Sequence, residues 1–247
     1  MGRWSRGLAP TLVRFAGIRD GDVVLDVGSG TGALAAEIAF AAPRSRIVGI
    51  DPAAPYVAFA QSKRAHPRIT FEVGEAQRLR FEDGTFDRTL SLLAMNFIPN
   101  PQNAIREMKR VTRSGGTIAA AVWDYGAGME MLRMFWDAAV ALNPADDDKD
   151  ERHMRFSRRG ELGSLWRSEG LRDVIEEGLT IEARFSSFED YWAPFTEKQG
   201  PAGAYVAALP AAQREELRLQ LRQRVLAEAP DRAFTLNAKA WAVRGTR

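Results

Sequence analysis

The sequence predicts an α/β fold in which helices flank a mostly parallel sheet. From Asp20 to about Trp123, short β-branched runs alternate with longer helical patterns, which is typical of parallel strands joined by crossover helices. One short apolar strand runs directly into three alternating glycines, a tight strand-to-helix turn that such sheets use. After Trp123 the alternation loosens and helical patterns dominate, so we predict a helical cap inserted into the domain.

The elements of the first half follow from local patterns in chain order. We expect strands at residues 23–27, 46–50, 69–73, 88–92 and 117–122. We expect helices over residues 32–42, which Pro43 closes, over 55–64 and over 103–111. The last of these has apolar residues at helical spacing, and Ser114-Gly115-Gly116 is expected to end it.

The elements of the second half are predicted with the same rules. Helices are expected over residues 129–142, 160–169 and most of 186–231, and strands over 174–185 and 234–243. The final strand is expected to return to the sheet. We therefore predict a single domain over residues 1–247, with a core at 20–124, added helices at 126–170 and 186–231, and the last strand at 234–243.

The composition is that of a globular chain, with 45% hydrophobic and 27% charged residues. No apolar run approaches the roughly 20 residues that cross a bilayer, and the N-terminus lacks the apolar stretch of a secretory signal. Cysteine is absent, which excludes disulfides and thiolate metal sites, and we expect no metal. The net charge is +2 and basic residues are interspersed with acidic ones, so we expect no nucleic-acid partner. These features indicate a cytoplasmic protein.

Asp26 distinguishes two interpretations of the glycine loop VLDVGSGTG, residues 24–32. Alternating glycines let the backbone approach a ligand closely, and Gly28-x-Gly30-x-x-Ala33 also fits a dinucleotide fingerprint. A dinucleotide places its pyrophosphate on the helix N-terminus, where an added carboxylate would repel it. A buried acid at this turn instead favours a ligand that carries a positive charge, such as an ammonium or a sulfonium. S-adenosylmethionine carries both.

Four motifs, in order and spacing, resemble those of the class I S-adenosylmethionine-dependent methyltransferases. The resemblance is to the branch that includes the ubiquinone/menaquinone methyltransferases and many small-molecule methyltransferases, known as methyltransferase type 11. It covers about residues 20–123. The motifs are VLDVGSGTG at 24–32, GIDP at 49–52, GEAQRLRFEDGTFD at 74–87 and REMKRVTRSGG at 106–116.

The resemblance implies a Rossmann-like class I methyltransferase fold with a mostly parallel seven-stranded sheet, and S-adenosylmethionine as the cofactor. In this family the first motif holds the methionine end of the cofactor, the acid of the second binds the ribose hydroxyls, and the acid of the third reaches the adenine. That third acid is Glu75 here, one methylene longer than the usual aspartate. The implied cofactor-binding residues are Asp26, Gly28, Ser29, Gly30, Gly32, Asp51, Pro52, Glu75, Ala76 and Leu92.

Plainer alternatives remain open at this point. Asp51 could cap the helix that follows, with Pro52 at the first helical position, and Glu75 could be a solvated loop acid. Two other functions also fit such a sheet. One is an NAD(P)-dependent oxidoreductase, and the other is an S-adenosylmethionine-binding protein that has lost catalysis.

No residue stands out as a catalytic base, and the weak candidates are Asn96, Asp124 and His153. Asn96-Phe97 stands where relatives often carry His-His after the fourth strand. We predict methyl transfer to a small aromatic or lipophilic molecule. The helices at 129–142 and within 186–231 are rich in Met, Phe and Trp, and we expect them to cover the acceptor.

Overall fold

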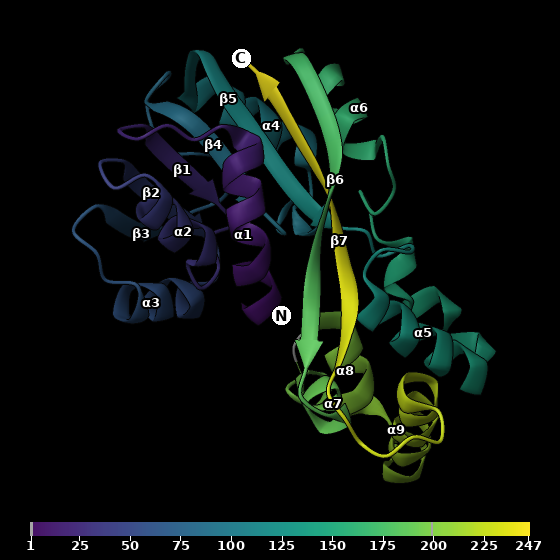
Figure 1. Cartoon of the computed structure of the whole chain (residues 1–247). Helices are drawn as coiled ribbons and strands as arrows, with labels where there is room; N and C mark the ends of the chain where they lie inside the picture. The colour runs from purple at the N-terminus through teal and green to yellow at the C-terminus, as the bar shows by residue number, and fades with distance from the viewer. Residues whose placement is uncertain (1, 199) are drawn as a thin grey trace. The chain divides into compact units, whose positions relative to one another are not determined.

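The computed structural model describes residues 2–198 and 200–247 and contains a seven-stranded sheet flanked by helices (Figure 1). The strand order is β3-β2-β1-β4-β5-β7-β6. Neighbouring strands from β3 to β5 pair in parallel, and in Figure 1 the arrow of β7 points against that of β6. The predicted α/β class and mostly parallel sheet are therefore confirmed. The strands are β1 Val23–Val27, β2 Arg46–Asp51, β3 Ile69–Val73, β4 Phe86–Leu92, β5 Thr112–Trp123, β6 Arg172–Phe185 and β7 Phe234–Thr246.

The helices also agree closely with the sequence patterns. The α-helices are α1 Gly2–Ala16, α2 Ala33–Ala41, α3 Ala54–Lys63, α4 Pro101–Val111, α5 Glu130–Leu142, α6 Glu161–Ser168, α7 Phe188–Thr196, α8 Gly200–Ala208 and α9 Ala211–Leu226. Three short 3-10 helices are η1 Met95–Phe97, η2 Pro144–Lys149 and η3 Glu151–His153. Helix α4 starts where Asn100 accepts a hydrogen bond from the Asn103 amide at 3.0 Å, with Pro101 in its first turn.

The chain forms two compact units. The sheet unit contains residues 2–122, 158–179 and 240–247, and the helical unit contains residues 123–157 and 180–239. The sheet unit holds strands β1 to β4, almost all of β5, the first part of β6 and the last part of β7, together with α1 to α4 and α6. The helical unit holds α5, α7, α8 and α9, the last part of β6 and the first part of β7.

Strand β1 lies at the centre of the sheet unit and pairs with β2 on one side and with β4 on the other. Val24, Leu25 and Val27 have no exposed surface, as expected for a parallel strand that is covered on both faces. Asp26 is equally buried in the same strand. Burying a carboxylate at this position costs free energy, because the charge is removed from water, and the packing of the sheet does not need an acid there.

Strand β5 differs from its prediction because Ser114-Gly115-Gly116 does not form a turn. Helix α4 ends at Val111 and β5 begins at the next residue, so the two glycines lie inside the strand. The pairing with β4 is irregular there, since Phe86 lies opposite Thr112 whereas Arg88 lies opposite Thr117. The two glycines thus form a β-bulge. A Ser-Gly-Gly stretch in a sequence fits a bulge in a strand as well as the end of a helix, so the sequence did not distinguish the two.

The helical unit has an aromatic core. Phe135 and Phe195 stack with ring centroids 4.5 Å apart, and Trp136 packs on Tyr205 at 5.3 Å. The Tyr191 hydroxyl, which is fully buried, donates to the Met131 carbonyl at 2.9 Å. Helices α7, α8 and α9 confirm the prediction that most of residues 186–231 are helical. Phe135 and Trp136 are core residues of this unit.

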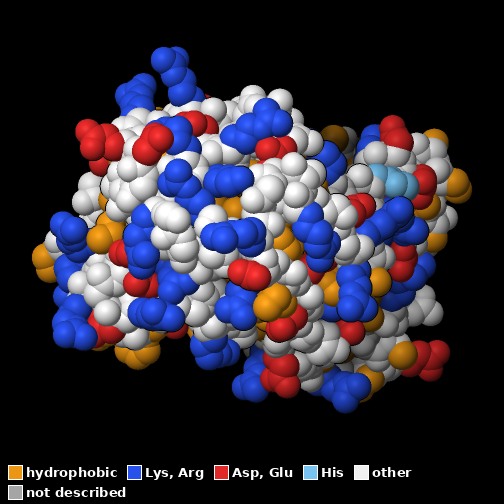
Figure 2. Space-filling view, turned by 90° about the horizontal axis from the view of Figure 1, so that it is seen from above, with side chains coloured by type: hydrophobic (Ala, Val, Ile, Leu, Met, Phe, Trp, Pro, Cys, Tyr) orange, Lys and Arg blue, Asp and Glu red, His pale blue; other side chains and the backbone are white. Residues whose placement is uncertain are grey.

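Basic and acidic side chains lie among one another on the face drawn in Figure 2, so that face shows no uninterrupted basic stripe. In the described part of the chain, no helix has both the length and the apolar character to cross a bilayer. The same residues contain no group of three histidine or acidic side chains that could hold a metal ion.

Candidate cofactor site

The glycine turn after β1 is held to the end of the neighbouring strand β2. Gly28, Gly30 and Gly32 all have positive φ, at 73°, 52° and 78°, which glycine adopts without steric cost. The amides of Gly28 and Ser29 both donate to the carbonyl of Ile50 at 2.8 Å, which fixes the turn to the end of β2. The turn is therefore a rigid, backbone-lined feature at the carboxyl edge of the sheet.

The three glycines differ in what surrounds them. A Cβ atom on Gly28 would lie 2.3 Å from the Cβ of Ala94, and one on Gly32 would lie 2.7 Å from the Phe71 ring. A Cβ atom on Gly30 would meet nothing within 4 Å. Packing therefore requires glycine at 28 and 32, whereas Gly30 leaves its backbone open on the side where a side chain would stand.

Asp51 organises this turn from the end of β2. Its Oδ2 accepts from the Gly30 amide and its Oδ1 from the Ala53 amide, each at 2.9 Å. The N-cap of α3 is Ala53, and Pro52 lies outside the helix. The capping alternative for Asp51 is therefore wrong: the side chain closes a two-residue turn and holds the glycine loop, and its free lone pairs remain available to a ligand hydroxyl.

Asp26 is the most unusual residue of the site. It has no exposed surface, and neither carboxylate oxygen has a hydrogen-bond partner among the described residues; the buried Ser29 hydroxyl lacks one too. Burial above all, and the negative charge of Asp51 to a lesser extent, raise the pKa of Asp26 to about 7. The Ala35 backbone amide lowers this pKa in part, although its geometry does not make it a hydrogen-bond partner of the carboxylate. Such an orphaned group calls for a partner, and a cation is the one that restores its charged form.

Glu75 and Ala76 lie in the turn after β3, where the Arg78 amide donates to the Glu75 carbonyl at 3.1 Å. Glu75 is exposed, and no hydrogen bond ties its carboxylate to other described residues. The carboxylate is thus free to reach a ligand, and its solvated alternative stays open.

Two residues of the fourth motif hold the loop that follows Glu75, a role that sequence reasoning missed. Glu107 Oε2 accepts from the Leu79 amide at 2.8 Å, and Arg110 donates to the carbonyls of Leu79 and Phe81 at 2.9 and 2.8 Å. Arg110 also pairs with Glu107 and Asp83, and its hydrogen bonds lower the pKa of Glu107. The spacing of Glu107 and Arg110 on the polar face of α4 was the available signal.

Replacing Arg110 by methionine should lower the free energy of unfolding by about 1 to 2 kcal/mol, because two loop carbonyls and two carboxylates lose a charged donor at a partly exposed site. Urea denaturation measures the loss. Arg44→Met is the control, since the Arg44 side chain is 81% exposed and pairs with Asp20, whose side chain is 37% exposed. Equal losses in both variants would contradict the assigned role of Arg110.

The segment after β4 is strained. Leu93 has a φ of 61°, a left-handed conformation that costs a leucine roughly 1 to 2 kcal/mol. Its amide donates to the Ala121 carbonyl at 2.8 Å, and the next residue, Ala94, fills the space beside Gly28. Leu92 is buried, and Asn96 lies in η1 with 7% of its surface exposed. Asn96 therefore lies in the sheet unit, two residues after the Ala94 that stands beside Gly28.

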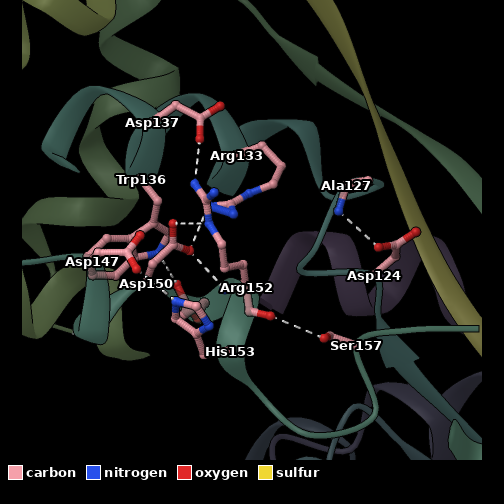
Figure 3. A network of polar contacts seen from close by, with 11 residues as sticks. Asp124, Ala127, Arg133, Trp136, Asp137, Asp147, Asp150, Arg152, His153 and Ser157 are labelled. Atoms are coloured by element: carbon pink, nitrogen blue, oxygen red, sulfur yellow. Dashed lines mark hydrogen bonds and ion pairs between the residues drawn. The ribbon is translucent and has the colours of Figure 1, made fainter. Parts of the chain in front are cut away.

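Asp124 and His153 belong to the helical unit and have local partners (Figure 3). Asp124 Oδ1 accepts from the Ala127 amide at 3.0 Å and closes the turn after β5. His153 is half-exposed, with its Nε2 3.3 Å from Asp147 Oδ2. These contacts give both side chains a structural role that needs no catalysis. A catalytic role stays a prediction for each of them.

Comparison with known proteins agrees with this geometry. Residues 25–120 match a family model described as "Methyltransferase domain". Demethylmenaquinone methyltransferase of Beutenbergia cavernae is 30% identical over 188 residues, which are 72% of this chain and 75% of that protein. The chain belongs to the class I S-adenosylmethionine-dependent methyltransferases. The resemblance found in the four motifs is thereby confirmed.

Other known proteins are similar to this chain as well. An uncharacterized protein of Mycobacterium tuberculosis is 33% identical over 132 residues, 52% of this chain and 48% of that protein, so the chain spans about half the length of such relatives. A putative methyltransferase of Bacillus halodurans shares the fold, with a TM-score of 0.61, 20% identity and coverage of 97% and 99% of the two chains. A phosphoethanolamine N-methyltransferase of Haemonchus contortus, solved with S-adenosyl-L-methionine, has a TM-score of 0.60 and 19% identity over 99% of this chain and 53% of that one.

S-adenosylmethionine is the cofactor of this family, and the residues at the glycine turn fit it. The orphaned Asp26 carboxylate matches a ligand with an ammonium group, and the buried Ser29 hydroxyl offers a further polar contact. Gly30 leaves the backbone open, and Asp51 stands at the end of β2 with lone pairs to spare. A pyrophosphate would meet the Asp26 charge unfavourably.

Proposed function

We propose that this protein transfers a methyl group from S-adenosylmethionine to a small aromatic or lipophilic molecule. The observation that carries the proposal is the fully buried Asp26, whose carboxylate has no partner in the described chain, beside an open glycine turn. The name of the Beutenbergia relative, a demethylmenaquinone methyltransferase, supports an acceptor of this kind. When bound, the cofactor supplies a methyl group on a positively charged sulfur that is a good leaving group.

The roles proposed for the residues follow from their positions. Asp26 binds the cationic end of the cofactor, and the Gly28-to-Gly32 turn presents its backbone to the same end. Asp51 binds the ribose while it orients the turn, and Glu75 with the Ala76 amide binds the adenine. Alignment of the reactants and exclusion of water then supply most of the rate enhancement, so a strong base is not required for every acceptor.

The wider proposals concern the whole chain. We propose that residues 1–247 act as one methyltransferase domain in the cytoplasm, that the acceptor is a small molecule and not a nucleic acid, and that the helices outside residues 20–124 select it. Support comes from the family match at 25–120, which leaves those helices outside the shared region. Asn96 is the proposed residue of the sheet unit nearest the chemistry, and Asp124 and His153 are kept as secondary candidates.

Calorimetry with the full chain tests the proposal. S-adenosylhomocysteine should bind and NAD should not. Glu75→Gln should weaken S-adenosylhomocysteine binding about 5- to 10-fold, because a charge-assisted hydrogen bond to the adenine becomes a neutral one, and should leave the melting temperature unchanged. Glu72→Gln, also exposed and three residues earlier in the edge strand β3, is the matched control. Binding of NAD, or an equal loss in both variants, would count against the proposal, and cofactor binding without methylation of any metabolite in a cell extract would indicate a silent cofactor-binding protein.

A further inference from the structure

The chain between β4 and α4 has a contact with the cofactor loops at each of its ends. We call residues 94–100 the η1 segment, after the 3-10 helix that it contains. At its start, Ala94 stands beside Gly28 of the glycine turn. At its end, the amide of Asn100 donates to Oε1 of Gln77 at 2.9 Å. All of these residues belong to the sheet unit, so both contacts lie within one compact body.

Gln77 lies in the turn after β3 that carries Glu75 and Ala76, the two residues proposed to bind the adenine. The Arg78 amide donates to the Glu75 carbonyl at 3.1 Å and closes this turn around Gln77. The Gln77 side chain is half-buried and leaves the turn toward Asn100. It is therefore a direct link between the adenine-binding turn and the η1 segment.

The flanks of this turn are held by other elements. The Gly74 amide donates to the Asp51 carbonyl of β2 at 3.2 Å, and the Leu79 amide donates to Glu107 of α4 at 2.8 Å. Asn100 is fixed as well, because its side chain caps α4 by accepting from the Asn103 amide. The hydrogen bond to Gln77 thus joins the middle of the turn to the residue at which the η1 segment ends and α4 begins.

The η1 segment carries the residues of the sheet unit nearest the proposed chemistry. Asn96 is buried, with 7% of its surface exposed, whereas Phe97 is 57% exposed. The segment also follows Leu93, whose left-handed conformation persists only where the surrounding contacts hold it. The placement of Asn96 and Phe97 therefore depends on the contacts at the two ends of the segment.

We propose that Gln77 is a positioning residue that couples the adenine end of the cofactor site to the η1 segment. The inference rests on the proposed methyl transfer and adds a regulator of the same site. A bound cofactor would restrict the Glu75 turn at one end of the segment and the glycine turn at the other. The hydrogen bond to Asn100 carries the first restriction into the segment, so Asn96 and Phe97 take their working placement when the cofactor is bound.

The test follows the η1 segment directly by fluorine NMR of the full chain. The chain contains no cysteine, so a single introduced cysteine takes one trifluoromethyl tag at a known position. Phe97→Cys places the tag on the exposed side of the segment, and Ser114→Cys places it at an exposed position near the amino end of β5. Saturating 5′-methylthioadenosine, which has the adenine and ribose but no amino-acid end, should shift the resonance of the tag at 97 and leave that of the tag at 114 unchanged.

Gln77→Met removes the acceptor and keeps the length of the side chain. In the protein tagged at position 97 it should reduce the shift at saturation by more than half. It should also weaken 5′-methylthioadenosine binding about 3- to 10-fold, because the turn is no longer pre-organised. Gln77→Glu keeps an oxygen for the Asn100 amide and should restore the shift. Gln61→Met is the matched control, since Gln61 ties α3 to the Phe71 carbonyl at 2.9 Å and does not contact Asn100 through that bond.

The outcomes separate this inference from the proposed function. Equal shifts of the tag in the presence and absence of Gln77→Met, an equal loss in Gln61→Met, or failure of Gln77→Glu to restore the shift would overturn the positioning role. Calorimetric binding of S-adenosylhomocysteine by Gln77→Met shows that the variant keeps its cofactor site. A wild type that binds neither S-adenosylhomocysteine nor 5′-methylthioadenosine would refute the proposed function, and the inference with it.

Discussion

Asp26→Asn should stabilise the cofactor-free protein by about 2 to 4 kcal/mol at pH 8 while it removes most cofactor binding. The folded-state pKa of Asp26 is raised to about 7, whereas an unfolded aspartate titrates near its ordinary pKa of 3.8. Between these values the folded state binds more protons than the unfolded state. Wild-type stability therefore falls as the pH rises from about 4 to 7 and stays at the lower level above that range.

Asparagine has no charge to bury and escapes this loss. Its gain over the wild type should fall by more than half at pH 5, where the folded wild type keeps Asp26 protonated. Urea denaturation at pH 5 and pH 8 measures both values, and Asp148→Asn, at an exposed position, is the control. Equal effects of Asp26→Asn at the two pH values would contradict the assigned burial of charge.

The same substitution should weaken S-adenosylhomocysteine binding at least 100-fold, since breaking a buried ion pair with the ligand ammonium costs about 3 kcal/mol or more. Calorimetry at pH 8 measures it. A variant that is more stable and yet fails to bind would show that Asp26 is retained for its ligand at the expense of the fold.

Gly28→Ala should unfold the protein or lower its stability by about 2 to 5 kcal/mol, whereas Gly30→Ala should cost only about 1 to 2 kcal/mol. Both residues have positive φ, so backbone strain is common to the two variants. Only at Gly28 does the new Cβ atom also lie 2.3 Å from Ala94. Thermal and urea denaturation of the two variants give the comparison.

Cofactor binding should respond in the opposite order for the variants that fold. The Cβ atom of Gly30→Ala projects into open space, and we expect it to reduce S-adenosylhomocysteine affinity at least 10-fold because a ligand approaches the backbone there. Unchanged affinity in Gly30→Ala would place the ligand away from this turn. Similar stability losses in both variants would refute the packing role of Ala94.

The sheet could be predicted well because its signals are local. The strand at 23–27 and that at 69–73 agree with β1 and β3, since apolar runs and flanking turns define parallel strands directly. The glycine turn followed from its spacing alone. The structural role of Asp51 was harder to predict, because an aspartate before a proline also fits a helix cap. Only the fold shows that its carboxylate oxygens accept from the amides of Gly30 and Ala53.

Residues that act through tertiary contacts could not be found in this way. Arg133 and Asp150 form a buried ion pair although they are 17 positions apart (Figure 3), and Asp150 sits in a charged stretch that predicts a solvated surface. Glu151 lies two residues from His153, which drew attention as a possible base, yet Glu151 is the buried one. Burial of a charge depends on which element packs over it, and no periodicity in the chain encodes that.

The crowding around the glycine turn has a consequence for the ancestry of this chain. A descendant that lost its cofactor would still be selected to keep Gly28 and Gly32, because Ala94 and the Phe71 ring stand where a Cβ atom would lie. Natural selection would release Asp26 first, for the stability gained, and would release Gly30 more readily than the other two glycines, because only its positive φ opposes a side chain there. A lineage that still uses its ligand is therefore marked by keeping Asp26 and Gly30. Keeping the glycines at 28 and 32 does not mark it, because packing requires them in any case.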